Sequence, residues 1–333
     1  QTGTEWQGMS RRLAILAVLW ALVAPSASGQ ETTASVTGTV MDQTGAVLPG
    51  VSVTARNTRT GWSKQVTTTG TGRYSVPFLP VGEYEIGFRF AGFRPYAARG
   101  VTLHVNDRLT VDVALSVAGR ETAVEVAVAP AGAVQPTSAA RFLMGPLEVQ
   151  ELPLNNRNFV QLATLVPGVA SSLPDEVGIG LTSTVSISIA GARRNAVNWF
   201  VDGASNVDVG SNITLLSTPT LESIEEFRII TSSYAAEWPR SGGGVVNLVT
   251  RGGTNTFRAT AYEYYRDDAL NANGFFRKQS DDPAVRDRPP ALEYHNFGYT
   301  LAGPLKKDRL LFFWSQEWRD IERAPTDRAA TVP

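Results

Sequence analysis

Few side chains in this sequence could carry out chemistry. The 333 residues include no cysteine and only two histidines, His104 and His295. Disulfide bonds, thiolate metal sites and a histidine-rich metal centre are therefore excluded. The paired carboxylates Asp267-Asp268 and Asp281-Asp282 occur in loop-like sequence, where solvation by water accounts for them.

Motifs of known enzyme chemistry are also absent from the sequence. It contains no Gly-x-Ser-x-Gly nucleophile elbow, no His-Glu-x-x-His metal motif and no phosphate-binding loop. The glycine run 242–244 lacks the lysine and the following helix that a phosphate loop requires. The net charge of -1 and the charged fraction of 18% give no field that would attract nucleic acid. We therefore expect neither an enzyme nor a nucleic-acid-binding protein, and no cofactor.

The N-terminus carries an export signal. Arg11 and Arg12 follow Met9, an apolar run occupies 13–23, and small residues fill 24–29. This order is typical of a signal peptide, with cleavage predicted before Gln30. The apolar run is shorter than the ~20 residues that a membrane-spanning helix needs. We interpret 1–29 as a leader and signal peptide in which Met9 is the natural start.

Residues 34–117 have the pattern of a small β-sandwich. Short runs alternate in polarity or are rich in β-branched residues, and turn residues separate them. Strands are predicted at 36–40, 51–55, 84–88 and 109–113. The core is expected to contain Tyr74, Phe78, Leu79, Tyr84, Phe88, Phe90 and Phe93.

The turns of this region carry a family resemblance. Gly45-Ala46-Val47-Leu48-Pro49-Gly50, Gly72-Arg73-Tyr74 and Pro80-Val81-Gly82-Glu83-Tyr84 resemble the carboxypeptidase regulatory-like domain. The resemblance implies a β-sandwich of the carbohydrate-binding-like fold, without peptidase activity. It leaves two roles open, a periplasmic spacer and a module that contacts sugar.

Residues 137–253 mix short helical and strand patterns. One helical pattern begins at Asn158 and ends before Pro167, and a second is predicted at 221–227. The acidic residues of the second helix are expected on its solvated side: Glu222, Glu225 and Glu226. Strands are predicted at 185–189, 198–203 and 227–231.

Several strings in this region resemble the plug domain of TonB-dependent receptors. They include Leu152-Pro153-Leu154-Asn155-Asn156-Arg157, Val201-Asp202-Gly203 and Ile224-Glu225-Glu226-Phe227. In the Oar-like branch of that family, a regulatory-like domain precedes the plug. The resemblance implies an α+β plug that fills a barrel lumen, with polar residues toward the hydrated wall. The candidates for that wall contact are Arg157, Arg193, Arg194, Glu225, Glu226 and Arg251. The glycine run 242–244 is expected to be a flexible turn from plug to barrel.

The linker 118–136 contains a string that resembles the TonB box. The linker is rich in Ala, Val, Gly and Pro. The six residues of the string are Glu121, Thr122, Ala123, Val124, Glu125 and Val126. An exposed stretch of this kind can add a strand to a partner's sheet. The resemblance implies that the partner is the periplasmic domain of TonB, with its inner-membrane energising complex. A last strand of the sandwich is the alternative.

Residues 254–333 have the pattern of outer-membrane barrel strands. Strands are predicted at 257–266, 294–302 and 309–319, with a long polar loop and then a tight turn at 303–308. Apolar-out and polar-in alternation is typical of such barrels, so outer-membrane lipid is an expected partner. About three strands fit here, whereas a transporter barrel needs about 22. We therefore expect a truncated barrel and an N-terminal fragment of a longer protein. A soluble antiparallel sheet is the alternative.

These patterns together predict a mainly β protein of the bacterial outer membrane, with its N-terminal domain in the periplasm. The expected function is energy-coupled uptake of a large or scarce ligand, such as a siderophore, an oligosaccharide or a peptide. The plug would gate the barrel. The alternative is an exported module for carbohydrate binding, cell-wall binding or adhesion.

Overall fold

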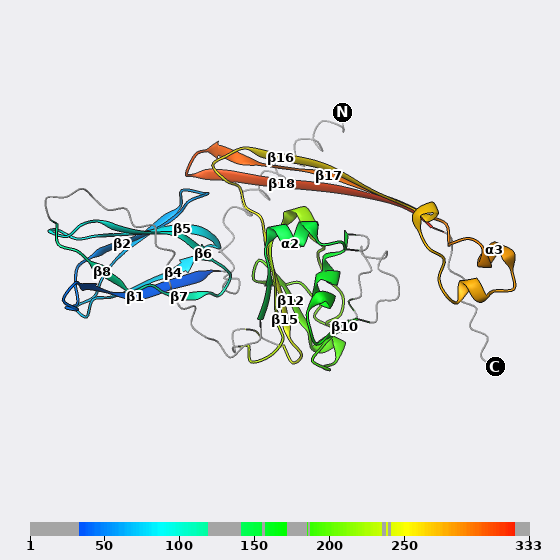
Figure 1. The fold of residues 1–333 in the computed structure, drawn as a ribbon, viewed down its shortest axis with the longest axis horizontal. Coiled ribbons are helices and arrows are strands. Elements are labelled where there is room, and N and C mark those ends of the chain that lie inside the picture. Colours follow the sequence, from blue (N-terminus) through cyan, green and yellow to red (C-terminus); the bar gives the residue numbers. More distant parts are fainter. Residues whose placement is uncertain are drawn as a thin grey trace, which may run out of the picture. The chain divides into compact units, whose positions relative to one another are not determined.

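The computed structural model describes residues 33–118, 141–154, 157–171, 185, 187–234, 238 and 241–323. The predicted signal peptide and the TonB-box string lie outside these residues. Strands dominate the described chain, as predicted (Figure 1). None of the helices in this part of the chain is both long and apolar enough to cross a membrane.

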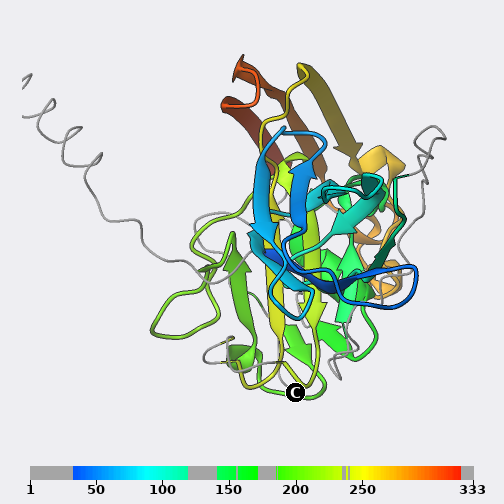
Figure 2. The same ribbon diagram turned by 90° about the vertical axis from the view of Figure 1, so that its left-hand side faces the viewer.

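The first domain is a β-sandwich of two four-stranded sheets, as the sequence predicted. One sheet has the order β4(Arg73–Leu79), β1(Ala34–Asp42), β7(Arg108–Thr110), and β8(Val113–Leu115) also pairs with β1. The other has the order β3(Ser63–Thr67), β2(Ser52–Asn57), β5(Gly82–Arg89), β6(Tyr96–Leu103). Figure 2 shows these strands in blue to cyan. Strict alternation along β1 places every second side chain in one shared apolar core.

One predicted core residue of the sandwich is wrong. Tyr74, Leu79, Tyr84 and Phe88 are buried as expected, but Phe78 is 57% exposed. The backbone of Phe78 has a positive φ of 60°. The register shifts here, because Ala34 pairs with Leu79 whereas Val36 pairs with Val76. The resulting bulge turns Phe78 outward and gives the inward position to Leu79.

The other two expected aromatics lie at the margin of the core. Phe90 and Phe93 are partly buried and pack against it. Their ring centroids are 5.5 Å apart. They therefore extend the core without being enclosed by it.

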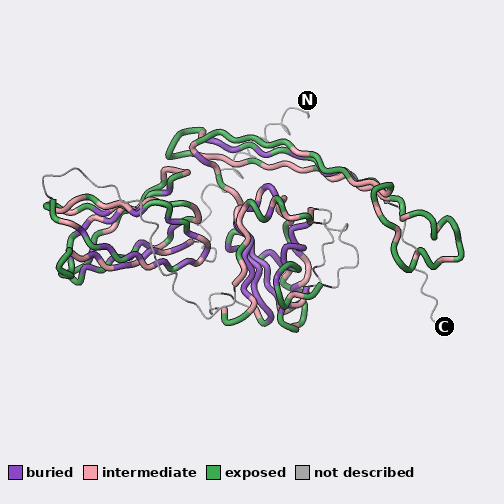
Figure 3. Tube along the Cα trace, in the orientation of Figure 1, coloured by how far each residue is buried: buried purple, intermediate pink, exposed green. Residues whose placement is uncertain are grey.

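The predicted plug segment contains a five-stranded mixed sheet. Its order is β13(Ala204–Ser205), β12(Asn198–Val201), β15(Val245–Thr250), β14(Ile224–Ile230), β9(Arg141–Met144). Short elements accompany it: α2(Pro146–Glu151), the 3-10 helices η2(Phe159–Leu165), η4(Arg194–Ala196) and η5(Leu221–Ser223), and the hairpin β10(Val169–Ser171) with β11(Ile187–Ile189). The central strands are buried almost throughout (Figure 3). This α+β arrangement has its own apolar core.

The predicted helix at 221–227 is wrong. Only 221–223 form a short 3-10 helix, and 224–230 form strand β14. Glu222 and Glu226 are buried, not solvated. The reason is tertiary: β14 lies between β15 and β9, so sheet pairing overrides the local helical pattern.

The first predicted helix is present as 3-10 helix η2. The side-chain oxygen of Asn158 accepts a hydrogen bond from the backbone N–H of Val160 at 2.9 Å. Asn158 therefore caps the helix in the expected way. The apolar face predicted for this segment is buried in the plug core.

The glycine run 242–244 is not the predicted turn between plug and barrel. It leads into β15, which is a central strand of the plug sheet. A Cβ atom on Gly243 would lie 2.5 Å from the Cβ of Ala192. Gly244 has a positive φ of 120°, and a Cβ there would lie 2.9 Å from Ile189 Cδ1. Gly243 and Gly244 therefore allow a close approach of the backbone that a side chain would prevent.

The Val201-Asp202-Gly203 motif ties two strands together. Asp202 follows β12 with a positive φ of 49°. Its carboxylate accepts hydrogen bonds from the Thr250 N–H at 2.8 Å and from the Thr250 hydroxyl at 2.7 Å. These bonds join the end of β12 to the end of β15.

The last sheet has three long antiparallel strands in the order β16(Arg258–Asp267), β17(Leu292–Lys306), β18(Leu310–Arg323). Its predicted alternation is confirmed, because Phe297, Tyr299 and Leu301 are exposed while Asn296 and Thr300 are buried. Strand β17 continues into the predicted turn 303–308 and ends at Lys306, so the reversal occurs at 307–309. The loop between β16 and β17 contains η6(Asp268–Leu270), η7(Arg277–Gln279) and α3(Pro283–Arg286).

Candidate functional site

Arg157 joins the predicted plug to the first long strand. Its guanidinium carbon lies 3.8 Å from the ring centroid of Tyr264 and 5.7 Å from that of Tyr262, both on β16. Arg157 also forms an ion pair with Glu222. A cation over an aromatic face contributes about 0.5–2 kcal/mol, with the larger values at desolvated sites. Arg157 therefore holds the plug segment against the strand assigned to the barrel.

Further polar contacts extend from Arg157 along β16 and β18. Burial raises the pKa of Glu222, and the positive charge of Arg157 opposes that rise. The Tyr262 hydroxyl donates to Glu317 Oε2 at 3.2 Å, and Arg319 Nε donates to Glu317 Oε1 at 2.7 Å. Both Glu317 and Arg319 belong to β18. The plug segment and the sheet of β16, β17 and β18 (called the barrel sheet below) thus meet through paired polar groups.

A cavity of about 370 Å³ opens beside these groups. Its walls are the segment 150–154, Arg157, Glu222 and three residues of β16: Thr260, Tyr262 and Tyr264. A polar wall of this kind suits a hydrated contact that can open and close.

Glu225 and Arg251 form a second cluster with Arg59 of the sandwich. Arg59 Nη2 lies 2.5 Å from Glu225 Oε1, and Arg251 Nε lies 3.7 Å from Glu225 Oε2. Arg251 Nε also donates to the carbonyl oxygen of Ile224 at 3.2 Å. Burial lowers the pKa of Arg251, and the charge of Glu225 opposes that shift.

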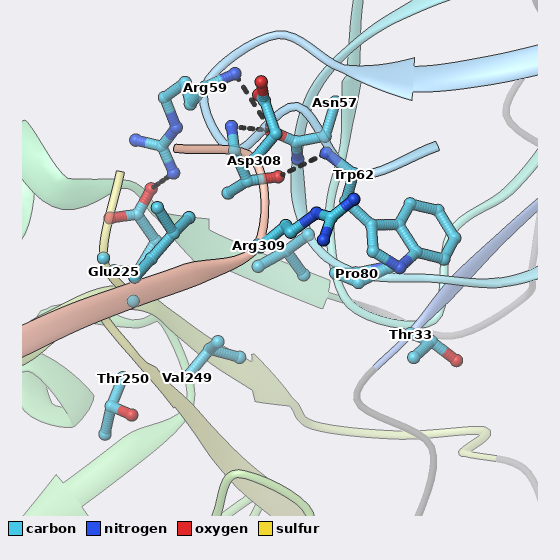
Figure 4. Close-up of a pocket in the computed structure, with 15 residues that line it drawn as sticks. Thr33, Asn57, Arg59, Trp62, Pro80, Glu225, Val249, Thr250, Asp308 and Arg309 are labelled. Carbon is cyan, nitrogen blue, oxygen red and sulfur yellow. Dashed lines mark hydrogen bonds and ion pairs between the residues drawn. The ribbon is translucent and has the colours of Figure 1, made fainter. Parts of the chain in front are cut away.

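A larger cavity of about 490 Å³ lies next to this cluster. Figure 4 shows Arg59 facing Glu225, with Trp62 and Arg309 near each other along another part of the wall. Asn255 connects the same region: its N–H donates to the Arg59 carbonyl oxygen at 3.0 Å, and its amide exchanges two 2.8 Å hydrogen bonds with Asp308. The cavity walls therefore come from the sandwich, the plug segment and the β17–β18 turn.

Glu226 belongs to a third cluster, which is the most buried. Arg228 Nε lies 3.2 Å from Glu226 Oε1, and Arg228 Nη2 lies 3.6 Å from Asp107 Oδ1. His104 Nδ1 lies 3.1 Å from Glu226 Oε2. Arg228 also donates to the backbone carbonyl oxygen of Val105. Two residues of β14 thus meet three residues of the sandwich loop between β6 and β7.

The remaining predicted wall residues, Arg193 and Arg194, lie at the short helix η4 and are exposed. Among the six candidates, Arg157 contacts β16, while Glu225 and Glu226 contact the sandwich. Arg251 pairs with Glu225. The role of the six as a barrel-facing set stays a prediction.

The sequence patterns did not predict Arg228, Asp107 or the two tyrosines of β16 as site residues. One signal for Arg228 was present, since it interrupts the otherwise apolar run Phe227-Arg228-Ile229-Ile230. A charge within a buried strand requires a partner. Its partner Asp107 is 121 residues away in the sequence, so the local pattern could not identify this partner.

Comparisons with known proteins cover most of the chain. The carboxypeptidase regulatory-like domain family matches residues 35–116, and an outer membrane beta barrel domain family matches 249–333. Over 297 residues the chain is 31% identical to the TonB-dependent transporter Oar of Myxococcus xanthus. That alignment covers 84% of this chain and 26% of the relative, so the chain spans about a quarter of the relative's length.

Two solved structures are also similar. The siderophore receptor PirA from Acinetobacter baumannii matches with a TM-score of 0.38 and 19% identity, covering 54% of this chain and 24% of that receptor. The siderophore receptor PirA from Pseudomonas aeruginosa matches with a TM-score of 0.36 and 17% identity, covering 55% and 28%.

Proposed function

The chain belongs to the TonB-dependent receptors of the bacterial outer membrane, and from this premise we propose that the protein takes up a ligand with energy transmitted by TonB. The single observation that carries the proposal is the 297-residue match to a TonB-dependent transporter. A match over 84% of the chain must include most of the region between the two family matches. That region contains the predicted plug and its polar contacts.

The plug would gate the barrel through the contacts around Arg157. A gate must hold firmly at rest and still release, which favours paired polar groups over an apolar interface. Arg157, Glu222 and the tyrosines of β16 form such a contact next to a 370 Å³ cavity. The proposed ligand is too large or too scarce for porins: a siderophore, an oligosaccharide or a peptide. No catalytic step is proposed.

Coupling to TonB would occur at the string that begins at Glu121. A Val124→Pro substitution removes a backbone donor and restricts an added strand. In the detergent-solubilised full-length protein, we expect this variant to lose capture by the purified periplasmic domain of TonB. Val124→Ala keeps the donor and should retain capture. Equal capture of the two variants would place the TonB contact elsewhere.

Uptake itself is tested in cells that express the full-length protein. Labelled ferric siderophores, oligosaccharides and peptides are supplied with and without a protonophore. We expect one class to accumulate only while the proton gradient is intact. Accumulation that persists without the gradient, or no accumulation of any class, would contradict the proposal.

A further inference from the structure

Two charged residues of β14 are buried, and besides each other they contact residues of another domain. Glu226 and Arg228 are each 3% exposed. Asp107, which contributes a carboxylate from the sandwich, is 7% exposed. Breaking a buried ion pair leaves a charge without compensation, so such a contact resists separation far more than a surface pair does.

The backbone of the sandwich loop takes part in the same contact. Val105 is completely buried, its carbonyl oxygen accepts from Arg228, and its N–H approaches Glu226 Oε2 at 3.4 Å. Asp107 also holds the loop in shape, because its Oδ2 accepts from the His104 N–H at 2.9 Å. The loop 104–107 is therefore preorganised to fit β14.

A separate part of the sandwich is attached to the barrel sheet. The β2–β3 turn contributes the carbonyl oxygen of Arg59, which accepts from the Asn255 N–H at 3.0 Å. Asn255 in turn is bonded to Asp308 in the β17–β18 turn. The Arg59 side chain reaches Glu225 of β14. The sandwich is thus bonded to Asn255, which links it to the β17–β18 turn, and it contacts β14 at two places.

We propose that the carboxypeptidase regulatory-like sandwich is a clamp that holds plug strand β14 in place relative to the barrel. The clamp contacts β14 at two places. Loop 104–107 contacts Glu226 and Arg228, and Arg59 forms an ion pair with Glu225. The sandwich is anchored to the barrel through Asn255. This residue is hydrogen-bonded to the Arg59 carbonyl oxygen and to Asp308 in the β17–β18 turn. The spacer role that the sequence left open is thereby replaced by a restraining one.

The clamp lies on the strand next to the one that the linker enters. Strand β9 begins at Arg141, shortly after the predicted linker 118–136, and pairs with β14 at the edge of the plug sheet. On the plug side, tension on the linker would therefore reach β9 first. With β14 held by the sandwich, β9 would separate from β14 before β14 leaves β15. This consequence rests on the proposed TonB coupling, whereas the clamp itself does not.

The test is hydrogen–deuterium exchange in the full-length protein in outer-membrane vesicles, without TonB or ligand. The variant combines His104→Ala with Asp107→Asn, and the matched control is Glu85→Ala, which removes the exposed Arg99–Glu85 pair of the same domain. We expect the amides of β14 to exchange at least about tenfold faster in the variant than in the control. The amides of β1 report whether the sandwich is intact.

A second variant keeps the test decisive if the loop substitutions unfold the sandwich. Arg59→Glu changes a turn residue outside the core and places like charges opposite Glu225. It should also accelerate exchange in β14. The clamp is rejected if β14 exchanges at the control rate in both variants. For the loop variant, this outcome counts when the β1 amides remain protected. Uptake plays no part in this measurement, so its outcome is separable from that of the proposed function.

Discussion

Glu226 and Arg228 are buried, and each has an oppositely charged side chain within reach. Glu226 has Arg228 and His104 as neighbours, and Arg228 has Asp107 as well. Arg157 and Glu222 repeat the arrangement at the β16 contact. At the scale of single residues, these pairs decide where the plug segment is held, because an unpaired charge in the same surroundings would be strongly unfavourable.

His104 makes one of these contacts sensitive to pH. The hydrogen bond to Glu226 raises the pKa of His104 above its ordinary value of 6.5, and Asp107 adds to the rise. Burial and Arg228 act in the opposite direction. Since the folded pKa is raised, the stabilisation is fully present below 6.5 and is lost as the pH rises through the folded value.

We therefore predict that the protection of β14 amides falls as the pH rises above 6.5 and through the raised pKa of His104. The measurement is hydrogen–deuterium exchange, corrected for the intrinsic pH dependence of the rate. His104→Gln, which keeps a donor but does not titrate in this range, should show no such fall. Parallel profiles for the natural protein and His104→Gln would show that His104 does not titrate against Glu226.

At the scale of elements, close backbone approach governs which strands can pair. Strand β1 is central to its sheet, between β4 and the parallel β7. Gly38 of this strand faces the carbonyl group of Val111. The N–H of Val111 donates to the Thr37 carbonyl oxygen at 2.8 Å. The hydroxyl of Tyr74 donates to the Val111 carbonyl oxygen at 2.7 Å. This crowding leaves no room for a side chain at Gly38.

Gly38→Ala should destabilise the sandwich. The new Cβ would lie 2.0 Å from the Val111 carbonyl oxygen, which cannot move without breaking the β1–β7 contact. Overpacking of this kind costs about 1–3 kcal/mol. The measurement is proteolysis of the sandwich at increasing urea concentration. Gly70→Ala is the control, since nothing lies within 4 Å of its Cβ. Equal urea midpoints for the two variants would refute the steric argument.

At the scale of the whole molecule, the exposed face of β17 and β18 determines where the protein resides. Phe297, Leu301, Trp314 and Trp318 are all exposed large apolar residues. They lie opposite each other in register, with Phe297 beside Trp318 and Leu301 beside Trp314. A continuous apolar face of this size suits the hydrocarbon layer of the outer membrane.

Leu301→Lys should therefore reduce assembly into the outer membrane. A lysine on the lipid face costs about 2–4 kcal/mol at the bilayer midplane and less near the interfaces. The measurement is the fraction of folded full-length protein recovered in outer-membrane vesicles. Leu301→Met preserves the apolar surface and should assemble normally. Equal recovery of the two variants would mean that this face does not contact lipid.

The local alternation of apolar and polar residues was sufficient to predict much of the architecture. Alternation identified the long strand now seen as β17 and the face on which Leu301 lies. The same reasoning placed Tyr84 and Phe88 in the sandwich core. These features depend only on residues a few positions apart, because the two faces of a strand are set by its own repeat of two. The sequence by itself therefore determined the mainly β class and the orientation of the barrel strands.

Tertiary structure decided the features that depend on distant partners. Strand β14 is a strand, not the predicted helix, because β9 and β15 enclose it. Phe78 is outside because the pairing of β4 with β1 contains a bulge. His104 meets Glu226 across 122 residues of sequence, and Arg157 of the plug segment meets Tyr264 of strand β16. No local pattern encodes such pairs, since only the packing of whole sheets brings them within reach.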